Sequence, residues 1–332
     1  MKFLIAMGPC ETRDSFFTQK ALAEIGQYGE IVFNETGKYA LDKELLQEKI
    51  KDIDVLFSGW GTARVDADVL ACANKLKIHA HTGGSVAPYI SKEEYDRGVV
   101  VLSGNDLYAK SVAEGCLCYT LISLRRADEY MQAMRQGGWR PTPDVTQGLI
   151  GRKVGIAGYG AIAKYYVDLL RWFGVELYVH SNYITDAEVQ RIGAKRASLT
   201  EIFSQCDIIS LHAALNDEHR GMITAELISL IKEGALFVNT ARAGLVDNDA
   251  LVGALAKGRF KAVVDVYPEE PLEKESPLRS LPNVITFPHI AGPTFDMREK
   301  VIFELMADIR RVWNSEPVKN GIPYEHAIRM TV

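Results

Sequence analysis

Three polar side chains, Arg242, Glu270 and His289, are of the types needed to transfer a proton on a substrate that carries an acid group. Each follows an apolar run that is predicted to be a buried strand, and open α/β sheets bind their ligands at the carboxyl ends of the strands. A guanidinium is permanently charged and binds a carboxylate through two parallel hydrogen bonds. An imidazole titrates near neutrality, and a neighbouring carboxylate favours its protonated form. The three residues therefore predict an acid/base site for a carboxylate substrate.

A glycine-rich segment follows the expected strand 154–157 and opens an expected helix. It has the Gly-x-Gly-x-x-Ala form, in which the first glycine permits a tight turn and the second lets the backbone approach a pyrophosphate. The helix amino terminus adds free N–H groups and a partial positive charge. Glycines also gather in ordinary turns, but the strand-turn-helix context favours dinucleotide binding. The candidate cofactor contacts are Gly158, Tyr159, Gly160, Ala161 and Ile162, with the small Ala163 closing the motif.

The end of the next expected strand lacks the acidic residue that usually holds the ribose hydroxyls of the dinucleotide. His180, Ser181 and Asn182 occupy this place. Ser181 can form a hydrogen bond to a hydroxyl, but it cannot repel a 2'-phosphate as a carboxylate would. A plain polar strand end is the alternative interpretation. We therefore expect Ser181 and Asn182 to contact the cofactor and to discriminate only weakly between NAD(H) and NADP(H).

Short apolar runs alternate with amphipathic stretches through the first hundred residues, which predicts strands joined by helices and therefore a parallel sheet. The expected strands are 3–7, 31–33, 55–57, 76–81 and 99–102, and the expected helices are 12–28, 42–50 and 66–73. Helical spacing then extends over 109–126, which suits a connecting or interface helix better than another crossover.

A second alternating series begins near Lys153 and predicts a second doubly wound sheet. Its expected strands are 154–157, 176–180, 208–211, 236–239, 262–266 and 284–287, with helices at 161–173 and 247–257. Ser198 and Glu201 have the spacing of a capping box at the start of a further helix. The last helical stretch, 297–313, has no sheet of its own, so we expect it to pack on the first domain.

The length and charge of the chain limit the classes of protein to which it can belong. A chain of 332 residues favours two domains, and a formal charge of -5 offers no general attraction to nucleic acid or anionic membranes. No run of apolar residues is long enough to span a bilayer, and the amino terminus lacks the pattern of a signal peptide. Five scattered cysteines show no zinc-site spacing. We expect a cytoplasmic protein with no metal site.

Several short motifs together carry a family resemblance. They are 112–114 (Val-Ala-Glu), 210–212 (Ser-Leu-His), 239–244 (Asn-Thr-Ala-Arg-Ala-Gly), 264–272 (Val-Asp-Val-Tyr-Pro-Glu-Glu-Pro-Leu) and 288–292 (Pro-His-Ile-Ala-Gly). With the glycine-rich segment, they resemble the D-isomer-specific 2-hydroxyacid dehydrogenases over nearly the whole chain. The resemblance implies a fold of two doubly wound α/β domains. A Rossmann dinucleotide-binding domain (99–289) is inserted into a flavodoxin-like substrate domain (1–98 and 290–332).

The resemblance also implies roles for individual residues. Arg242 would bind the substrate carboxylate and polarise its carbonyl, His289 would donate or accept the proton, and Glu270 would orient and charge His289. Glu269 is the less favoured partner, because the family's glutamate directly precedes proline. Further cofactor contacts would be His212, Thr240 and Asp265, of which Asp265 resembles the residue that holds the nicotinamide carboxamide. An aspartate at a strand end is also often only a turn former.

The substrate loop matches the family less well. The family commonly cradles the substrate carboxylate with backbone amides of a Gly-x-Gly loop, and this chain offers Gly59 with Trp60, and Gly83 with Gly84. Ser85 stands where the second glycine is usual. Trp60 and Trp139 could wall a pocket, although burial in the core is the more common role of a tryptophan.

The resemblance predicts an oxidoreductase that uses NAD(H) or NADP(H) to interconvert a small 2-keto acid and its D-2-hydroxy acid, acting as a homodimer through the nucleotide domain. A formate dehydrogenase is a less favoured enzyme alternative, because it would carry glutamine in place of Glu270. A second alternative is a non-enzymatic scaffold that senses dinucleotides, like the corepressors built on this fold. Such a scaffold can keep the catalytic residues, but the chain shows no appended basic segment for its partners.

Overall fold

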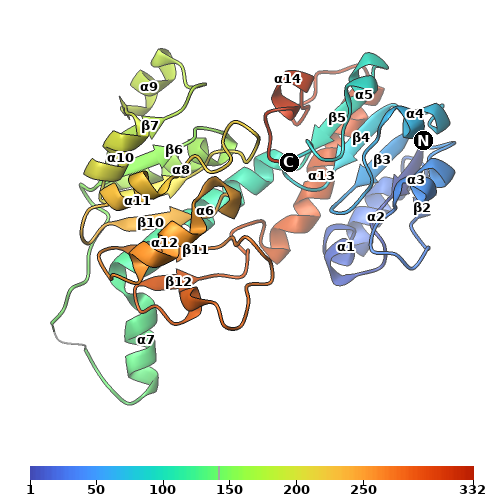
Figure 1. Cartoon of the computed structure of the whole chain (residues 1–332). Helices are drawn as coiled ribbons and strands as arrows, with labels where there is room; N and C mark the ends of the chain where they lie inside the picture. Colours follow the sequence, from blue (N-terminus) through green and yellow to red (C-terminus); the bar gives the residue numbers. More distant parts are fainter. Residues whose placement is uncertain (141–142) are drawn as a thin grey trace. The chain divides into compact units, whose positions relative to one another are not determined.

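The computed structural model describes residues 1–140 and 143–332 and divides the chain into two compact units. The first unit contains residues 1–108 and 293–332, and its strands form one parallel five-stranded sheet in the order β2-β1-β3-β4-β5 (Figure 1). Its strands are β1 (Lys2–Ile5), β2 (Glu30–Phe33), β3 (Val55–Ser58), β4 (Ile78–His81) and β5 (Val100–Ser103). This strand order is that of flavodoxin, so the predicted flavodoxin-like sheet is confirmed.

Helices cover both faces of the first sheet. The helices are α1 (Glu11–Phe16), α2 (Gln19–Gly26), α3 (Lys43–Lys49), α4 (Ala67–Cys72), α5 (Lys92–Asp96), α13 (Phe295–Trp313) and α14 (Tyr324–Ala327). The helices α1, α2 and α13 share a buried apolar cluster with one face of the sheet, while α3 and α4 pack against the other face. Leu305 and Ile309 of α13 are fully buried in the first of these clusters. The expected packing of the last long helix on the first domain is therefore confirmed.

Two details of the first unit differ from expectation. The single helix expected over 12–28 is two helices, because Phe17 leaves the helical conformation and the Thr18 side chain caps α2 by accepting the N–H of Ala21. The strand β5 pairs with β4 in the first sheet, so the first unit continues to residue 108, past the predicted boundary at 98–99. The return to the first unit comes at residue 293, close to the predicted 290.

The second unit, residues 109–292, contains a parallel seven-stranded sheet in the order β12-β11-β10-β9-β6-β7-β8. Its strands are β6 (Lys153–Ala157), β7 (Glu176–His180), β8 (Lys195–Arg196), β9 (Ile208–Leu211), β10 (Leu236–Asn239), β11 (Lys261–Val264) and β12 (Val284–Thr286). Numbered within the sheet, the first six strands have the Rossmann order 3-2-1-4-5-6. The chain reverses its direction of winding between β6 and β9, which is where such sheets bind dinucleotides.

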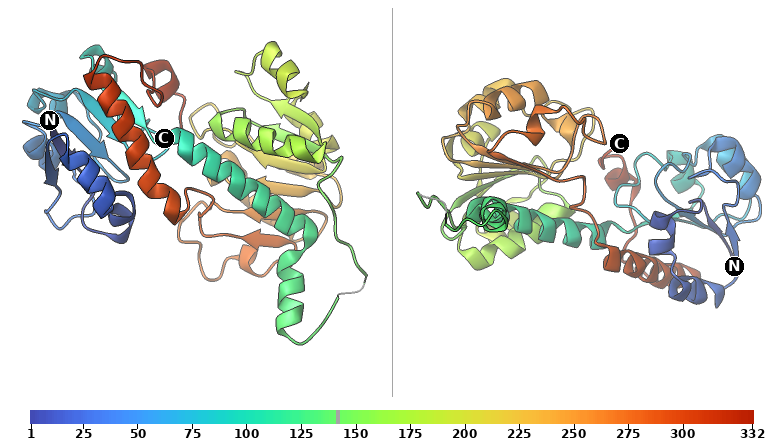
Figure 2. Two further views of the ribbon diagram at one scale, coloured as in Figure 1. Left: turned by 180° about the vertical axis from the view of Figure 1, so that it is seen from behind. Right: turned by 90° about the horizontal axis from the view of Figure 1, so that it is seen from below.

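Helices also cover both faces of the second sheet (Figure 2). The long helix α6 and the helix α8 pack on one face, and α10, α11 and α12 pack on the other. The helices and short 3-10 turns are α6 (Asn105–Arg125), α7 (Ala127–Arg135), α8 (Ala161–Leu170), η1 (Arg171–Phe173), α9 (Asp186–Ile192), α10 (Leu199–Gln205), α11 (Ala225–Leu230), η2 (Ala243–Leu245), α12 (Asn248–Leu255) and η3 (Pro277–Arg279). The capping box expected at Ser198 and Glu201 opens α10 and is confirmed. Within the described residues, no helix is long and apolar enough to cross a bilayer.

Candidate active site

The candidate catalytic residues lie at the carboxyl ends of three neighbouring strands of the second sheet. Arg242 follows β10, Glu270 follows β11 and His289 follows β12. The strands end nearly level, because Asn239 pairs with Val264 and Val264 pairs with Thr286. The parallel register thus carries three residues from distant parts of the sequence to one edge of the sheet.

His289 and Glu270 form a hydrogen-bonded pair. The Nδ1 atom of His289 lies 2.7 Å from Oε2 of Glu270, and the side chains are 42% and 37% exposed. The second carboxylate oxygen, Oε1, accepts the backbone N–H of Tyr267 at 3.1 Å, which holds the Glu270 carboxylate in place. Since Nδ1 faces the carboxylate, Nε2 is the nitrogen left for a substrate. The structure therefore brings Glu270, and not Glu269, to His289.

Asp265 fixes the backbone that carries His289. Its carboxylate oxygens accept the N–H groups of Ile290 and Ala291, both at 2.9 Å. His289 itself has a φ of 55°, in the left-handed region that residues other than glycine rarely adopt. Burial raises the pKa of Asp265, and the two backbone N–H groups oppose that shift. Asp265 is thus a positioning residue for His289, in addition to its predicted contact with the cofactor.

Hydrogen bonds to residues at the end of β10 hold Arg242 in place. Its Nη1 donates to the carbonyl oxygen of Ala241 at 2.7 Å, and its carbonyl oxygen accepts Nδ2 of Asn239 at 3.2 Å. Burial lowers the pKa of the Arg242 guanidinium, and the negative charge of Glu270 partly opposes this shift. A partly buried cation beside an acid/base pair is suited to bind a carboxylate.

Two aromatic residues outside the set predicted from the sequence, Tyr267 and Tyr119, also support the site. The phenol of Tyr267 donates to the carbonyl oxygens of Val264 at 2.9 Å and Phe287 at 2.7 Å, which ties the end of β11 to the end of β12. Tyr119 of α6 stacks on Phe287 with ring centroids 3.9 Å apart. The position of Tyr267 within the motif 264–272 could have identified it as part of the site. Nothing in the sequence around Tyr119 indicates its contact with Phe287.

The glycine turn after β6 has the geometry of a pyrophosphate cradle. Gly158 has a φ of 95°, and a Cβ added there would lie 2.4 Å from the backbone nitrogen of Ala213, so only glycine fits. A Cβ added at Gly160 would meet nothing within 4 Å, and Gly160 caps the ten-residue helix α8. Open space at the amino terminus of a helix fits the phosphates of a dinucleotide. Ala161 and Ile162 form the first turn of α8, and the Tyr159 phenol donates to Glu188 at 2.9 Å.

The other candidate cofactor residues divide into exposed and buried groups. Ser181 and Asn182 directly follow β7, and Asn182 is exposed. His212 is buried, its Nε2 lies 2.8 Å from the Ser210 hydroxyl, and burial lowers its pKa to about 3. The Thr240 hydroxyl is also buried, 2.9 Å from the Cys116 sulfur. The side chains of His212 and Thr240 therefore have internal partners, and a contact of either residue with a cofactor stays a prediction.

The candidate substrate loops lie in the first unit. Gly59 is buried and its N–H donates to the Thr62 hydroxyl at 3.1 Å, so this amide already has an acceptor. For the amides of Gly83 and Gly84 the structure shows no acceptor within residues 1–140 and 143–332. Trp60 is 37% exposed and lies between Phe16 and Tyr108. Trp139, in the second unit, is 76% exposed, so burial in the core is wrong for both tryptophans.

A buried polar network underlies these loops. Glu94 binds Nδ1 of His79 at 2.9 Å, Nε2 of His79 binds the Ser58 hydroxyl at 2.7 Å, and that hydroxyl binds Nδ1 of His81 at 2.9 Å. All four residues are almost fully buried. Burial lowers the pKa of His81 to about 3, with a smaller effect of His79 in the same direction. Ser58 precedes Gly59 and His81 precedes the segment 82–84, so the network joins the starts of both loops.

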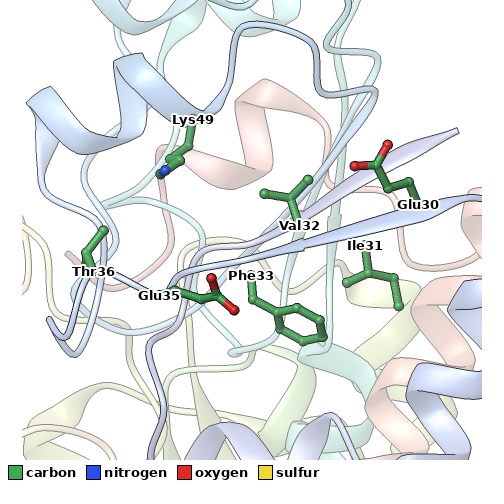
Figure 3. A pocket seen from close by; sticks show the side chains of 7 residues that line it. All are labelled: Glu30, Ile31, Val32, Phe33, Glu35, Thr36 and Lys49. Carbon is green, nitrogen blue, oxygen red and sulfur yellow. The ribbon is translucent and has the colours of Figure 1, made fainter.

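A recess outside this site follows the edge strand β2. Its lining residues are Glu30, Ile31, Val32, Phe33, Glu35, Thr36 and Lys49 (Figure 3). None of the residues selected from the sequence lines it. In the part of the chain that the structure describes, no three His, Cys, Asp or Glu side chains are grouped as ligands for a metal ion.

Comparisons with known proteins show the family of the chain. Residues 117–291 match the family model described as the NAD-binding domain of D-isomer specific 2-hydroxyacid dehydrogenases. A D-3-phosphoglycerate dehydrogenase of Methanocaldococcus jannaschii is 32% identical over 91% of this chain and 56% of its own length. A glyoxylate reductase of Thermococcus onnurineus is 31% identical over 79% of this chain and 80% of its own. A crystal structure of a Thermus thermophilus protein is 25% identical over 97% of this chain and 100% of its own, with a TM-score of 0.78. The chain spans about half the length of the phosphoglycerate dehydrogenases it matches.

Proposed function

Because the chain belongs to the D-isomer specific 2-hydroxyacid dehydrogenase family, we propose that it transfers a hydride between a nicotinamide dinucleotide and a small 2-keto or D-2-hydroxy acid. The observation that carries this proposal is the pair formed by His289 and Glu270, with Nδ1 and Oε2 2.7 Å apart. This pair lies in the same unit as the glycine turn at Gly158. A proton-transfer pair and a dinucleotide cradle in one unit are what a hydroxy-acid dehydrogenase requires.

The reaction in the reducing direction follows from the groups present. A bound reduced nicotinamide supplies the hydride that attacks the keto carbon. Arg242 holds the substrate carboxylate and draws electron density from the neighbouring carbonyl. His289 donates the proton on Nε2 to the keto oxygen, so the hydroxy acid forms without a free alkoxide. Glu270 stabilises the imidazolium before this transfer, and the same groups act in reverse during oxidation.

The glycine-rich turn would hold either NAD(H) or NADP(H). Gly158 and Gly160 would let the pyrophosphate approach the backbone, and the amino terminus of α8 would stabilise its charge. Ser181 and Asn182 would contact the adenosine ribose. Within the first unit, Gly83 and Gly84 would offer backbone amides to an acid group.

We also propose a homodimer and a cytoplasmic location. The support for the dimer is apolar surface on the second unit that the single chain leaves uncovered. No residue of α7 is buried, and Met131 and Met134 on this helix are each 52% exposed. Trp172, in the 3-10 turn η1 that follows α8, is 90% exposed. A second copy of the chain would cover such surface, and the mass of the protein in solution tests this.

Turnover with a panel of 2-keto acids tests the proposed function. The assay follows the loss of reduced nicotinamide absorbance with glyoxylate, hydroxypyruvate, pyruvate and longer 2-keto acids, using NADH and NADPH in turn. Saturable turnover with at least one acid is the expected result. Binding of a dinucleotide without turnover of any acid would favour the non-enzymatic scaffold instead.

A further inference from the structure

A carboxylate from a different part of the second unit reaches the strand end that lacks its usual acidic residue. Glu218 belongs to the loop after β9, and its Oε1 accepts Nδ2 of Asn182 at 3.1 Å. Its Oε2 accepts the phenol hydrogen of Tyr183 at 3.3 Å. Both partners directly follow Ser181, so the carboxylate of Glu218 is held against the segment after β7.

This contact joins the loops that follow β7 and β9, at the carboxyl end of the sheet beside the glycine turn. The strand β6 lies between β7 and β9, with Ala157 paired to His180 on one side and to Leu211 on the other. Gly158 donates its N–H to the carbonyl oxygen of His180 at 2.8 Å. The loops after β7 and β9 therefore flank the glycine turn, and Glu218 links them where the adenosine ribose of a dinucleotide is bound in this fold.

The charges around Ser181 do not cancel that of Glu218. One cation contacts this segment: Arg196 donates its Nη1 to the Ser181 carbonyl oxygen at 3.5 Å. Its Nη2 donates to Asp186 at 2.7 Å, so an acidic side chain already offsets this cation. The hydrogen-bond partners of Glu218 are a neutral amide and a neutral phenol, and the His219 imidazole lies 4.0 Å away. Among the charged side chains in these contacts, Asp186 and Glu218 are acidic and Arg196 is basic, so negative charge is in excess.

We propose that Glu218 is the specificity residue that selects NAD(H) over NADP(H), in place of the carboxylate missing after β7. Its oxygens accept hydrogen bonds from the ribose hydroxyls of NAD(H), and its charge repels the 2'-phosphate of NADP(H). This inference rests on the proposed use of a dinucleotide. A preference for NAD(H) set by Glu218 replaces the weak discrimination between NAD(H) and NADP(H) that is expected from Ser181 and Asn182 alone.

Direct binding measurements separate this inference from the proposed function. The dissociation constants of NADH and NADPH are measured for the full chain without substrate, from quenching of tryptophan fluorescence or by calorimetry. We expect the parent to bind NADH at least about tenfold more tightly than NADPH, which corresponds to about 1.4 kcal/mol. Failure to bind either dinucleotide would contradict the proposed function, and tight binding of both with equal affinity would contradict only the role of Glu218.

The variant Glu218→Gln removes the charge and keeps the size of the side chain. We expect it to tighten NADPH binding about tenfold and to change NADH binding by less than about threefold, so that the preference is largely lost. Asp217→Asn is the matched control, because it removes the same charge from the neighbouring residue of the loop, and it should keep the parent's preference. An unchanged ratio of the NADH and NADPH dissociation constants in Glu218→Gln, or an equal change of this ratio in both variants, would overturn the proposal.

Salt provides a second measurement on the same proteins. Repulsion between exposed charges is screened as ionic strength rises. The ratio of the two dissociation constants should therefore fall with salt in the parent and stay nearly constant in Glu218→Gln. Glu218→Ala repeats both measurements if the glutamine variant is poorly folded. A ratio with the same salt dependence in parent and variant would assign the preference to other residues.

Discussion

The Nδ1 atom of His289 and the Oε2 atom of Glu270 lie 2.7 Å apart, although the two residues are nineteen positions apart in the sequence. The contact depends on three separate supports. Tyr267 donates its N–H to the Glu270 carboxylate, Asp265 accepts the two N–H groups that follow His289, and the Tyr267 phenol joins the two strand ends. The pair is thus built into the loops after β11 and β12, and each support can be tested.

Glu270→Gln should move the pH profile of keto-acid reduction to lower pH. Reduction requires the protonated form of His289, and the variant removes the negative charge that stabilises this form. The pH above which kcat/KM falls should therefore decrease. The measurement is kcat/KM from pH 5 to pH 9 for the parent, Glu270→Gln and the control Glu269→Gln. A shift in Glu269→Gln without one in Glu270→Gln would show that the neighbouring carboxylate is the functional partner.

Arg242→Ala should lower kcat/KM by at least about a hundredfold, equivalent to roughly 2.7 kcal/mol of transition-state stabilisation. The guanidinium both anchors the carboxylate and polarises the carbonyl, so its removal affects binding and chemistry together. Arg242→Lys should recover only part of the loss, because an ammonium keeps the charge without the two-pronged geometry. NADH affinity, measured in the same samples, should change little. Turnover near that of the parent would contradict the role of Arg242.

Asp265→Asn should loosen the backbone around His289. An amide has one oxygen to accept the two N–H groups of Ile290 and Ala291, so one of these buried donors loses its partner. We expect the free energy of unfolding of the second unit to fall by about 1–3 kcal/mol. We also expect a lower kcat, because His289 is less firmly positioned. Urea unfolding and steady-state kinetics check the two effects, and a variant with parental stability and kcat would contradict the positioning role of Asp265.

Buried histidines should make the protein sensitive to moderate acid. Burial lowers the pKa of both His81 and His212 to about 3, whereas an unfolded histidine titrates near 6.5. Between these values the unfolded chain binds more protons than the folded chain, so stability is fully present above pH 6.5 and is lost as pH falls toward 3.

His212→Gln tests this pH dependence in the second unit, since glutamine can still form a hydrogen bond with Ser210. The variant should reduce the slope of unfolding free energy against pH by up to about 1.4 kcal/mol per pH unit, which is the value for one proton. Urea unfolding of parent and variant at pH 5, 6, 7 and 8 gives the slope. The same slope in both proteins would mean that His212 is not the group that titrates on unfolding.

Local sequence patterns were sufficient to predict much of the fold. Mostly apolar runs of three to six residues marked eleven expected strands, because a strand in a parallel sheet is buried on both faces and is therefore rich in apolar residues. The glycine-rich segment was recognisable because a φ of 95° at Gly158 and its closeness to Ala213 exclude other residues. The break between α1 and α2 was missed because apolar spacing continues across it, while the signal for the break is a single capping threonine.

The residue types of the site were also visible in the sequence, because only a few side chains can hold a carboxylate or transfer a proton near neutral pH. Which of them meet was decided by the tertiary structure. The choice of Glu270 over Glu269 depends on the path of the loop after β11, and the contact of Glu218 with Asn182 joins loops from strands on opposite sides of β6. The links among Ser58, His79, His81 and Glu94 likewise require β3, β4 and α5 to be packed together. Such contacts leave no periodic signal in the sequence, because they depend on the distance between chain segments that only the folded sheet brings side by side.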